Sequence, residues 1–175
     1  RQVPVIIVGA ILYQTNLILY LRNIEVIAWT TLIFAILLYF ADRAKVNKKL
    51  NAKLDFKTIF IIGCFQVLAL IPGVSRSGIV ITAGRFLEFD RYDSTKISFY
   101  LSIPVIAGAS FLGLKDLYKE SIDFNFMIIF TVFLSYIFSY FTIKYFLIFV
   151  KKFDLKIFVI YRIVLSILLF SIIYF

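Results

Sequence analysis

The chain has 175 residues, of which 62% are apolar, 19% are aromatic and 17% are charged. Ordinary soluble domains are about 45–50% apolar and about 25% charged. A domain of about 150 residues buries only about 68–70% of the surface that its unfolded chain exposes. This composition therefore excludes a soluble globular domain, a disordered chain and a disulfide scaffold. It predicts an all-α polytopic membrane protein.

The sequence contains one cysteine and no histidine. The single cysteine excludes an internal disulfide and a cysteine-based metal cluster. Without histidine, the side chain that most often carries protons at neutral pH is missing. The net charge of +9 is interpreted as loop asymmetry in a membrane protein, not as nucleic-acid binding. Arg1 leads directly into an apolar run that lacks the features of a signal peptide. We therefore expect residues 1–175 to form one integral membrane domain that lacks an N-terminal segment.

Five stretches are long enough, or nearly so, to cross a bilayer as helices. They are residues 3–21, 24–41, 97–114, 124–143 and 157–175. Segment 42–57 carries six basic residues and segment 151–156 carries three, whereas the loops between the other ends of the spans are poor in positive charge. The positive-inside rule places the two basic segments in the cytoplasm and the C-terminus outside.

Residues 58–84 must then leave the cytoplasm and return to it, because segment 85–96 also has to lie inside. These 27 residues are too few for two crossings, which need about 40. The remaining solution is a re-entrant hairpin of two half-helices, 58–71 and 79–84. They turn near the middle of the membrane at Pro-Gly-Val-Ser-Arg-Ser-Gly, residues 72–78.

This turn contains groups that bind phosphate. Arg76 offers a planar guanidinium, and Ser75 and Ser77 offer hydroxyl groups. Gly73 and Gly78 permit unusual backbone angles, and the start of the second half-helix favours an anion. An arginine at membrane depth marks a functional site by default. The alternative is that the arginine and the serines only form hydrogen bonds with backbone groups where the helix is interrupted. The phosphate or diphosphate site is favoured.

Two further polar residues lie within the apolar segments. Gln66 precedes the turn by about a turn and a half of helix, and it either faces the site or bonds another helix. Arg162 lies about five residues inside the last span. It can pair with a buried acid, bind a lipid phosphate or extend its charge to the cytoplasmic interface, and the last interpretation is favoured. The acidic residues of 88–93 are interpreted as part of a solvated loop with salt bridges.

Residues 62–78, Ile-Gly-Cys-Phe-Gln-Val-Leu-Ala-Leu-Ile-Pro-Gly-Val-Ser-Arg-Ser-Gly, closely resemble the second signature of the bacterial undecaprenyl-diphosphate phosphatases. This is the family linked to bacitracin resistance. The likeness continues within 82–91, covers 98–109, returns at 160–162 and extends weakly over the first two helices. It implies a hydrolase of the bacterial inner (plasma) membrane. Such an enzyme converts undecaprenyl diphosphate to undecaprenyl phosphate and inorganic phosphate, and so recycles the lipid carrier of peptidoglycan synthesis.

The resemblance also implies an inverted repeat with two re-entrant hairpins. Arg76 matches the essential arginine of the second signature and would hold and neutralise the diphosphate. The family's first signature, with its glutamates and histidine, has no counterpart here. We therefore expect the nucleophile and the general acid and base to lie outside this chain. The residues expected to bind the substrate are Gly73, Ser75, Ser77, Gly78 and Gln66.

No cofactor and no metal ligand are expected from this chain, although the resemblance implies a divalent cation such as Mg²⁺ or Ca²⁺ for the family. The expected partners are a prenyl diphosphate lipid and the membrane lipids, with no nucleic acid. A homodimer is one open arrangement. The alternative function is that of a transporter or flippase for a phosphorylated lipid or anion, because such proteins also use re-entrant hairpins and inverted repeats.

Overall fold

The computed structural model of the chain describes residues 5, 8–9, 21–50, 55–119 and 126–174. Over these residues the backbone forms helices and one isolated β-bridge, which confirms the all-α class. The helices are α3 (Ile24–Asp42), α4 (Phe56–Val67), the short 3-10 helix η1 (Leu68–Leu70), α5 (Arg76–Phe86), α6 (Arg91–Lys119), α7 (Phe126–Lys152) and α8 (Lys156–Tyr174). The predicted span 3–21 lies almost wholly outside the described residues.

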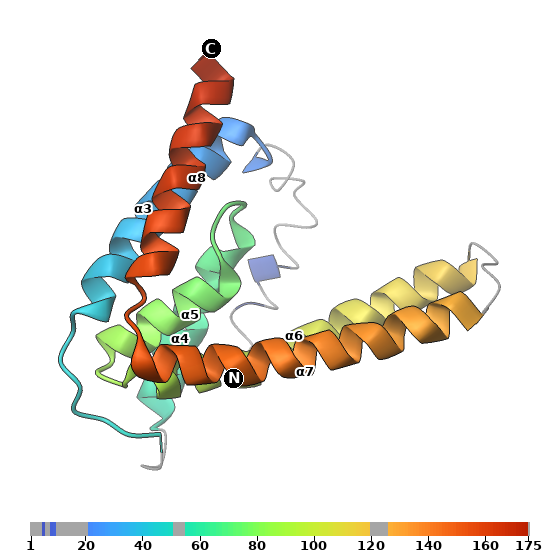
Figure 1. Cartoon of the computed structure of the whole chain (residues 1–175), viewed down its shortest axis with the longest axis horizontal. Coiled ribbons are helices and arrows are strands. Elements are labelled where there is room, and N and C mark those ends of the chain that lie inside the picture. Colours follow the sequence, from blue (N-terminus) through green and yellow to red (C-terminus); the bar gives the residue numbers. More distant parts are fainter. Residues whose placement is uncertain (1–4, 6–7, 10–20, 51–54, 120–125, 175) are drawn as a thin grey trace.

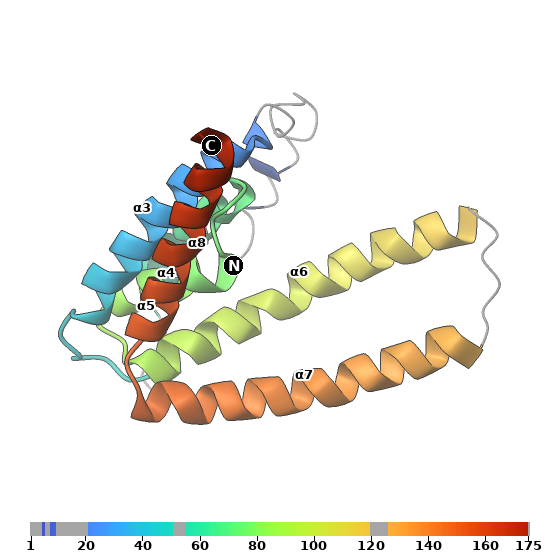
Figure 2. The ribbon, with the colours of Figure 1, turned by 45° about the horizontal axis from the view of Figure 1, so that its top comes forward.

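Long apolar helices identify the chain as a membrane protein. Within the described part, α3, α7 and α8 are long and apolar enough to cross a bilayer, judged by length and composition. Helix α6 runs through the predicted span 97–114 without a break, although Pro104 lies inside it. Together, α6 and α7 extend to one side of the molecule, away from α3 and α8 (Figure 2). None of the apolar window of α7 is buried, as expected of a surface that faces lipid or protein.

Helices α3 and α8 lie side by side and run in opposite directions (Figure 1). The side chain of Ser166 donates a hydrogen bond to the carbonyl oxygen of Ala28 at 2.8 Å. Ala28 and Ala35 are fully buried, and small side chains of this kind let two helix backbones approach closely. Trp29 packs its ring edge-on against Phe170, with the ring centroids 5.0 Å apart.

The helix pair predicted around 58–84 is present, with different bounds. Helix α4 and η1 together cover Phe56–Leu70, and α5 has 11 residues. Each is shorter than the roughly 20 residues that a crossing needs. The turn between them packs against Ile27 and Thr30, which lie in the first two turns of α3. The pair is therefore too short to cross a bilayer twice, as expected of a re-entrant hairpin.

Helix α5 is the most enclosed element. Every residue from Ile79 to Arg85 is buried. Its two sides contact two clusters of apolar side chains, one shared with α4 and α6 and the other with α3, α7 and α8. At Gly84 a Cβ atom would lie 2.6 Å from Ser94 Oγ of α6, so these two helices are in close contact. This packing fixes the position of α5 and, with it, the turn that precedes the helix.

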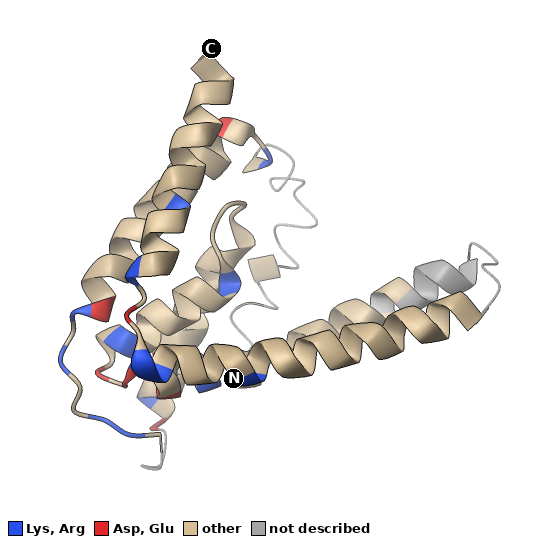
Figure 3. Ribbon diagram, in the orientation of Figure 1, with Lys and Arg blue, Asp and Glu red and all other residues tan. Residues whose placement is uncertain are grey.

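The links that follow α3, α5 and α7 come together at one end of the molecule (Figure 3). The buried carboxylate of Asp42 contacts residues of these links or next to them. Arg91 donates two hydrogen bonds to this carboxylate, at 2.6 and 3.1 Å, and also pairs with Asp154 at 2.6 Å. Arg85, only 3% exposed, donates to three main-chain carbonyl groups at 2.6–2.9 Å. A hydrogen bond from Lys156 and the charge of Arg91 lower the pKa of the Asp154 carboxyl.

The acidic residues of 88–93 differ from the solvated, salt-bridged loop predicted for them. Asp93 accepts a hydrogen bond from the main-chain N–H of Leu50 at 2.8 Å. Asp90 accepts from the main-chain N–H of Asp93 at 2.6 Å and so caps the start of α6. These carboxylates therefore bind mainly backbone, while the neighbouring Arg91 takes its partners from distant parts of the chain.

Candidate functional site

The chain between η1 and α5 makes a tight turn at residues 71–74. The N–H of Val74 donates to the carbonyl oxygen of Ile71 at 3.2 Å, and Gly73 has a φ of +86°. Proline at the second position and glycine with positive φ at the third are typical of a type II turn. A Cβ atom at Gly73 would lie 2.2 Å from Thr30 Oγ1. Both the backbone angle and the close approach of α3 therefore require glycine.

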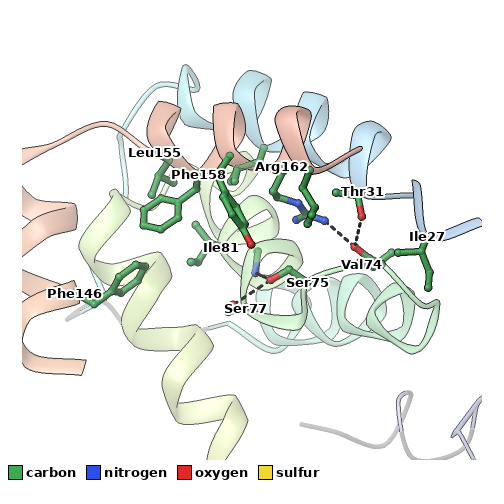
Figure 4. A pocket seen from close by; sticks show the side chains of 15 residues that line it. Ile27, Thr31, Val74, Ser75, Ser77, Ile81, Phe146, Leu155, Phe158 and Arg162 are labelled. Carbon is green, nitrogen blue, oxygen red and sulfur yellow. Dashed lines mark hydrogen bonds between the residues drawn. The ribbon is translucent and has the colours of Figure 1, made fainter. Parts of the chain in front are cut away.

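Side chains from α3 and α8 hold this turn in place. Thr30 Oγ1 donates to the carbonyl oxygen of Pro72 at 2.7 Å. Thr31 Oγ1 lies 3.4 Å from the carbonyl oxygen of Gly73. The same carbonyl accepts a hydrogen bond from Nη2 of Arg162 at 2.8 Å (Figure 4). The turn is thus fixed to both helices of the α3–α8 pair.

The position of Arg162 corrects the sequence-based interpretation. The residue is 8% exposed, and its guanidinium lies at the turn instead of extending to the cytoplasmic interface. Sequence reasoning missed this residue as part of the site, because its distance from the end of the span was compatible with an interfacial position. The likeness of residues 160–162 to the phosphatase family was the signal that pointed toward it.

The N-terminus of α5 carries unused hydrogen-bond donors. Ser75 is the N-cap, and its Oγ accepts the N–H of Gly78 at 3.1 Å. The N–H groups of Arg76 and Ser77 have no acceptor within the helix and none among the other described residues. The hydroxyl oxygens of Ser75 and Ser77 lie 3.2 Å apart. Free N–H groups, hydroxyl donors and the positive end of the helix dipole together favour an anion.

A cavity of about 540 Å³ lies beside this helix end. Its polar lining residues are Thr31, Ser75, Ser77, Tyr161 and Arg162, together with the backbone of the two glycines (Figure 4). None of the described residues that line it carries a carboxylate. The cavity therefore has one end suited to an anion and one end suited to an apolar chain. The apolar part is lined chiefly by Leu38, Ile81, Phe146, Leu155 and Phe158.

Four of the six predicted site residues come together at this cavity: Gly73, Ser75, Ser77 and Gly78. Arg76 is the first residue of α5, is half-buried and does not line the cavity. Its guanidinium forms no hydrogen bond or ion pair with the described part of the chain, so it is free to bind a ligand.

Gln66 also lies away from the cavity. Its side chain is 1% exposed, and neither amide atom has a hydrogen-bond partner among the residues the structure describes. A buried amide without partners is unfavourable, which sets this residue apart from an ordinary packing position. Its role in substrate binding stays a prediction.

Metal binding receives no support from the described part of the chain. Nowhere in it do three His, Cys, Asp or Glu side chains lie close enough together to hold an ion. Because Mg²⁺ and Ca²⁺ prefer carboxylate and other oxygen ligands in proteins, the described residues do not fit such a cation by themselves. The divalent cation implied by the family resemblance stays a prediction.

Comparisons with known proteins agree with the resemblance. The profile of the family described as "Bacitracin resistance protein BacA" matches residues 2–168. The undecaprenyl-diphosphatase of Pelagibacter ubique (strain HTCC1062) is 54% identical over 98% of this chain and 68% of its own length. Those of Elusimicrobium minutum and Saccharophagus degradans are 43% and 41% identical, over 95% and 89% of this chain.

The chain spans 63% and 59% of the length of the last two relatives. The family profile nevertheless covers nearly all of the chain, and the resemblance identified from residues 62–78 is confirmed. This chain belongs to the bacitracin resistance protein BacA family.

Proposed function

We propose that this chain acts in the hydrolysis of undecaprenyl diphosphate to undecaprenyl phosphate and inorganic phosphate. Family membership supports the proposal, as do the relatives named undecaprenyl-diphosphatase. The structural observation that carries it is the N-terminus of α5. There, two free N–H groups, two serine hydroxyls and an unpaired guanidinium lie at the start of the most enclosed helix.

In this proposal the terminal phosphate of the substrate lies at the N-terminus of α5. The free N–H groups of Arg76 and Ser77 donate to its oxygens. The guanidinium of Arg76 stabilises the negative charge that develops as the bond between the terminal phosphorus and the bridging oxygen breaks. The oxygen of water becomes bonded to the terminal phosphorus, and the bridging oxygen stays on the lipid phosphate. None of the described residues that line the cavity carries a carboxylate, and the sequence has no histidine. The proposal therefore assigns no residue of the cavity lining as the base that takes a proton from water.

The substrate proposed is a prenyl diphosphate lipid in the inner (plasma) membrane of a bacterium. Basic residues gather at the end of the molecule where α3 ends and α8 begins (Figure 3), which supports a cytoplasmic location for that end. Helix α8 ends at the opposite end of the α3–α8 pair (Figure 1), so the proposal places the C-terminus outside.

The test measures release of inorganic phosphate from undecaprenyl diphosphate by the product of the whole gene in detergent micelles. We expect Arg76→Ala to lower kcat by about 10²–10³-fold, the usual effect of removing one preorganised donor. Arg76→Lys should recover part of the rate, because lysine keeps the charge but lacks the planar fork. Arg43→Ala removes an exposed arginine in the link after α3 and should keep the wild-type rate.

Wild-type kcat in the Arg76→Ala protein would contradict the assigned role of this residue. A wild-type protein that binds the lipid but releases no phosphate would contradict hydrolysis and favour transport of the lipid.

A further inference from the structure

The charge of Arg162 has no counter-ion among the described residues. The residue lies in α8, one of the helices long and apolar enough to cross a membrane, and it is 8% exposed. The ion pairs in this part of the chain involve Arg85, Arg91 and Lys156, and none includes Arg162. A guanidinium has five N–H donors, and here one contact, to the carbonyl oxygen of Gly73, is present. A buried charge is strongly unfavourable unless it is paired, so this position calls for an anion.

The remaining donors of Arg162 face the cavity. Its Nη1 lies 3.2 Å from the point where a Cβ atom would stand on Gly78. In Figure 4 the side chain extends from α8 toward the turn, and Arg162, Ser75 and Ser77 all line the cavity. An anion at this position would receive hydrogen bonds from α8 and from the start of α5 together. Gly78 leaves the room that the guanidinium occupies.

Arg162 lines the cavity and Arg76 does not, so the two guanidinium groups lie at different positions. A prenyl diphosphate likewise has two phosphoryl groups, and one of them carries the lipid. The apolar part of the cavity, with Ile81, Phe146 and Phe158, is continuous with the position of Arg162. The phosphoryl group beside an apolar chain is the one that bears the prenyl tail.

We propose that Arg162 binds the phosphate that stays on the lipid, and that the apolar part of the cavity holds the first isoprene units of its tail. The inference rests on the proposed function, because it says where the prenyl diphosphate substrate of that function binds. Arg162 thereby binds both the Gly73 carbonyl and the substrate, so that the turn and the lipid phosphate are positioned by one side chain. If Arg162 served only to hold the turn, a neutral hydrogen-bond donor would be enough. That role does not explain why a charged side chain is buried here.

The test measures binding of farnesyl phosphate, a short prenyl monophosphate that corresponds to the product, to the whole gene product in detergent micelles. Farnesol and inorganic phosphate are the comparison probes. Arg162→Gln removes the charge but keeps an amide donor. We expect it to weaken farnesyl phosphate binding on the order of 10- to 100-fold, the range expected for lost charge-assisted hydrogen bonds, while farnesol binding stays unchanged. Arg22→Gln, at an exposed arginine, is the matched control and should bind as wild type does.

Arg162→Lys keeps a positive charge and should show an intermediate loss, and it replaces the glutamine variant if that protein does not fold. Thermal unfolding of each variant separates loss of binding from loss of the turn. Wild-type affinity for farnesyl phosphate in folded Arg162→Gln would overturn the inference. Equal wild-type affinities for farnesyl phosphate and inorganic phosphate would overturn the placement of the tail.

The two proposals fail in different ways. A protein that binds farnesyl phosphate through Arg162 but releases no phosphate from undecaprenyl diphosphate contradicts the proposed function and leaves the inference standing. A protein that hydrolyses the diphosphate, and whose Arg162→Gln variant still binds farnesyl phosphate, contradicts the inference and leaves the proposed function standing. In an active enzyme, Arg162→Lys should mainly raise KM, whereas Arg76→Lys should mainly lower kcat.

Discussion

Gly73 lies where α3, α8 and the α4–α5 turn meet, and three separate constraints act on it. Its φ of +86° is a backbone conformation that side chains with a Cβ atom rarely adopt. Its Cα faces Thr30 at a distance that leaves no room for a methyl group. Its carbonyl oxygen is the acceptor that fixes Arg162. The geometry of the site therefore depends on the absence of a side chain here as much as on the charged groups around it.

Gly73→Ala should lower the melting temperature of the protein in detergent micelles. The strained backbone angle alone costs about 1–3 kcal/mol, and the overlap with Thr30 Oγ1 adds to it. Gly108→Ala is the matched control, because nothing lies within 4 Å of the Cβ position there. Alanine in the interior of a helix is favoured over glycine by about 1 kcal/mol, so the control should melt at the same temperature or higher. Equal melting temperatures for Gly73→Ala and wild type would contradict this account of the turn.

At the scale of the helices, α5 depends on contacts at both of its ends. Its N-terminus is held by the turn, and its C-terminal residues lie beside the charged network around Asp42. This carboxylate joins the end of α3 to the start of α6 through Arg91, and it accepts from the N–H of Leu155 before α8 at 3.3 Å. The pKa of the Asp154 carboxyl is lowered in the folded protein, so the ionised form of Asp154 stabilises the fold. This stabilisation is complete at neutral pH. It is lost as the pH falls below the usual carboxyl range.

Asp42→Asn should destabilise the protein by about 3–5 kcal/mol, because removing one partner leaves a buried charge without its counter-ion. Arg85, which lies 3.9 Å from this carboxylate, and Arg91 would both lose it. Asp154→Asn serves as the control, since Asp154 is exposed and its loss should change stability far less. Thermal unfolding of both variants in the same detergent compares them. Equal effects of the two substitutions would contradict the central role of Asp42.

At the scale of the whole molecule, the two ends differ in charge. The links after α3, before α6 and before α8 meet at one end, where basic residues gather (Figure 3). The long α6–α7 hairpin leaves this end and extends away from the α3–α8 pair (Figure 2). One end of the molecule is thus basic and cross-linked by ion pairs, which is the arrangement that the positive-inside rule associates with the cytoplasm.

Single-cysteine labelling tests this orientation. Cys64, the single cysteine of the sequence, is first replaced by serine. Lys45→Cys and Tyr174→Cys then place a thiol at an exposed position at each end. A membrane-impermeant maleimide added to intact cells should label Tyr174→Cys at once and Lys45→Cys only after the membrane is opened. The reverse pattern would contradict a cytoplasmic basic end.

Much of this arrangement could be predicted from the sequence, and the limits have physical causes. The hairpin could be predicted because the charge of the loops fixes their side of the membrane, and residues 58–84 are too few for two crossings. The turn could be predicted from its proline and glycines. The position of Arg162 did not follow, because α8 is apolar on nearly all sides and its periodicity does not show which face packs inward. Its partner, Gly73, is 89 positions away in the chain. The same applies to Asp42, whose partner Arg91 is 49 positions away.

The start of α5 was also placed too late by the sequence. The hairpin's second half-helix was expected to begin at residue 79, whereas the helix begins at Arg76 because Ser75 caps it. The shift of three residues puts Arg76 and Ser77 in the first helical turn, where Ser77 lines the cavity and Arg76 does not. The first residues of the helix, Arg-Ser-Gly, are typical of a loop, so the sequence did not show that the helix begins there.

The contact between Trp29 and Phe170 has a practical consequence for spectroscopy. Because the sequence contains a single tryptophan, all indole fluorescence of the chain comes from this one ring. The ring is half-exposed and packs against α8. It stands beside Thr30, which binds the turn. The emission of the unlabelled protein therefore reports on the α3–α8 contact, without the addition of a dye.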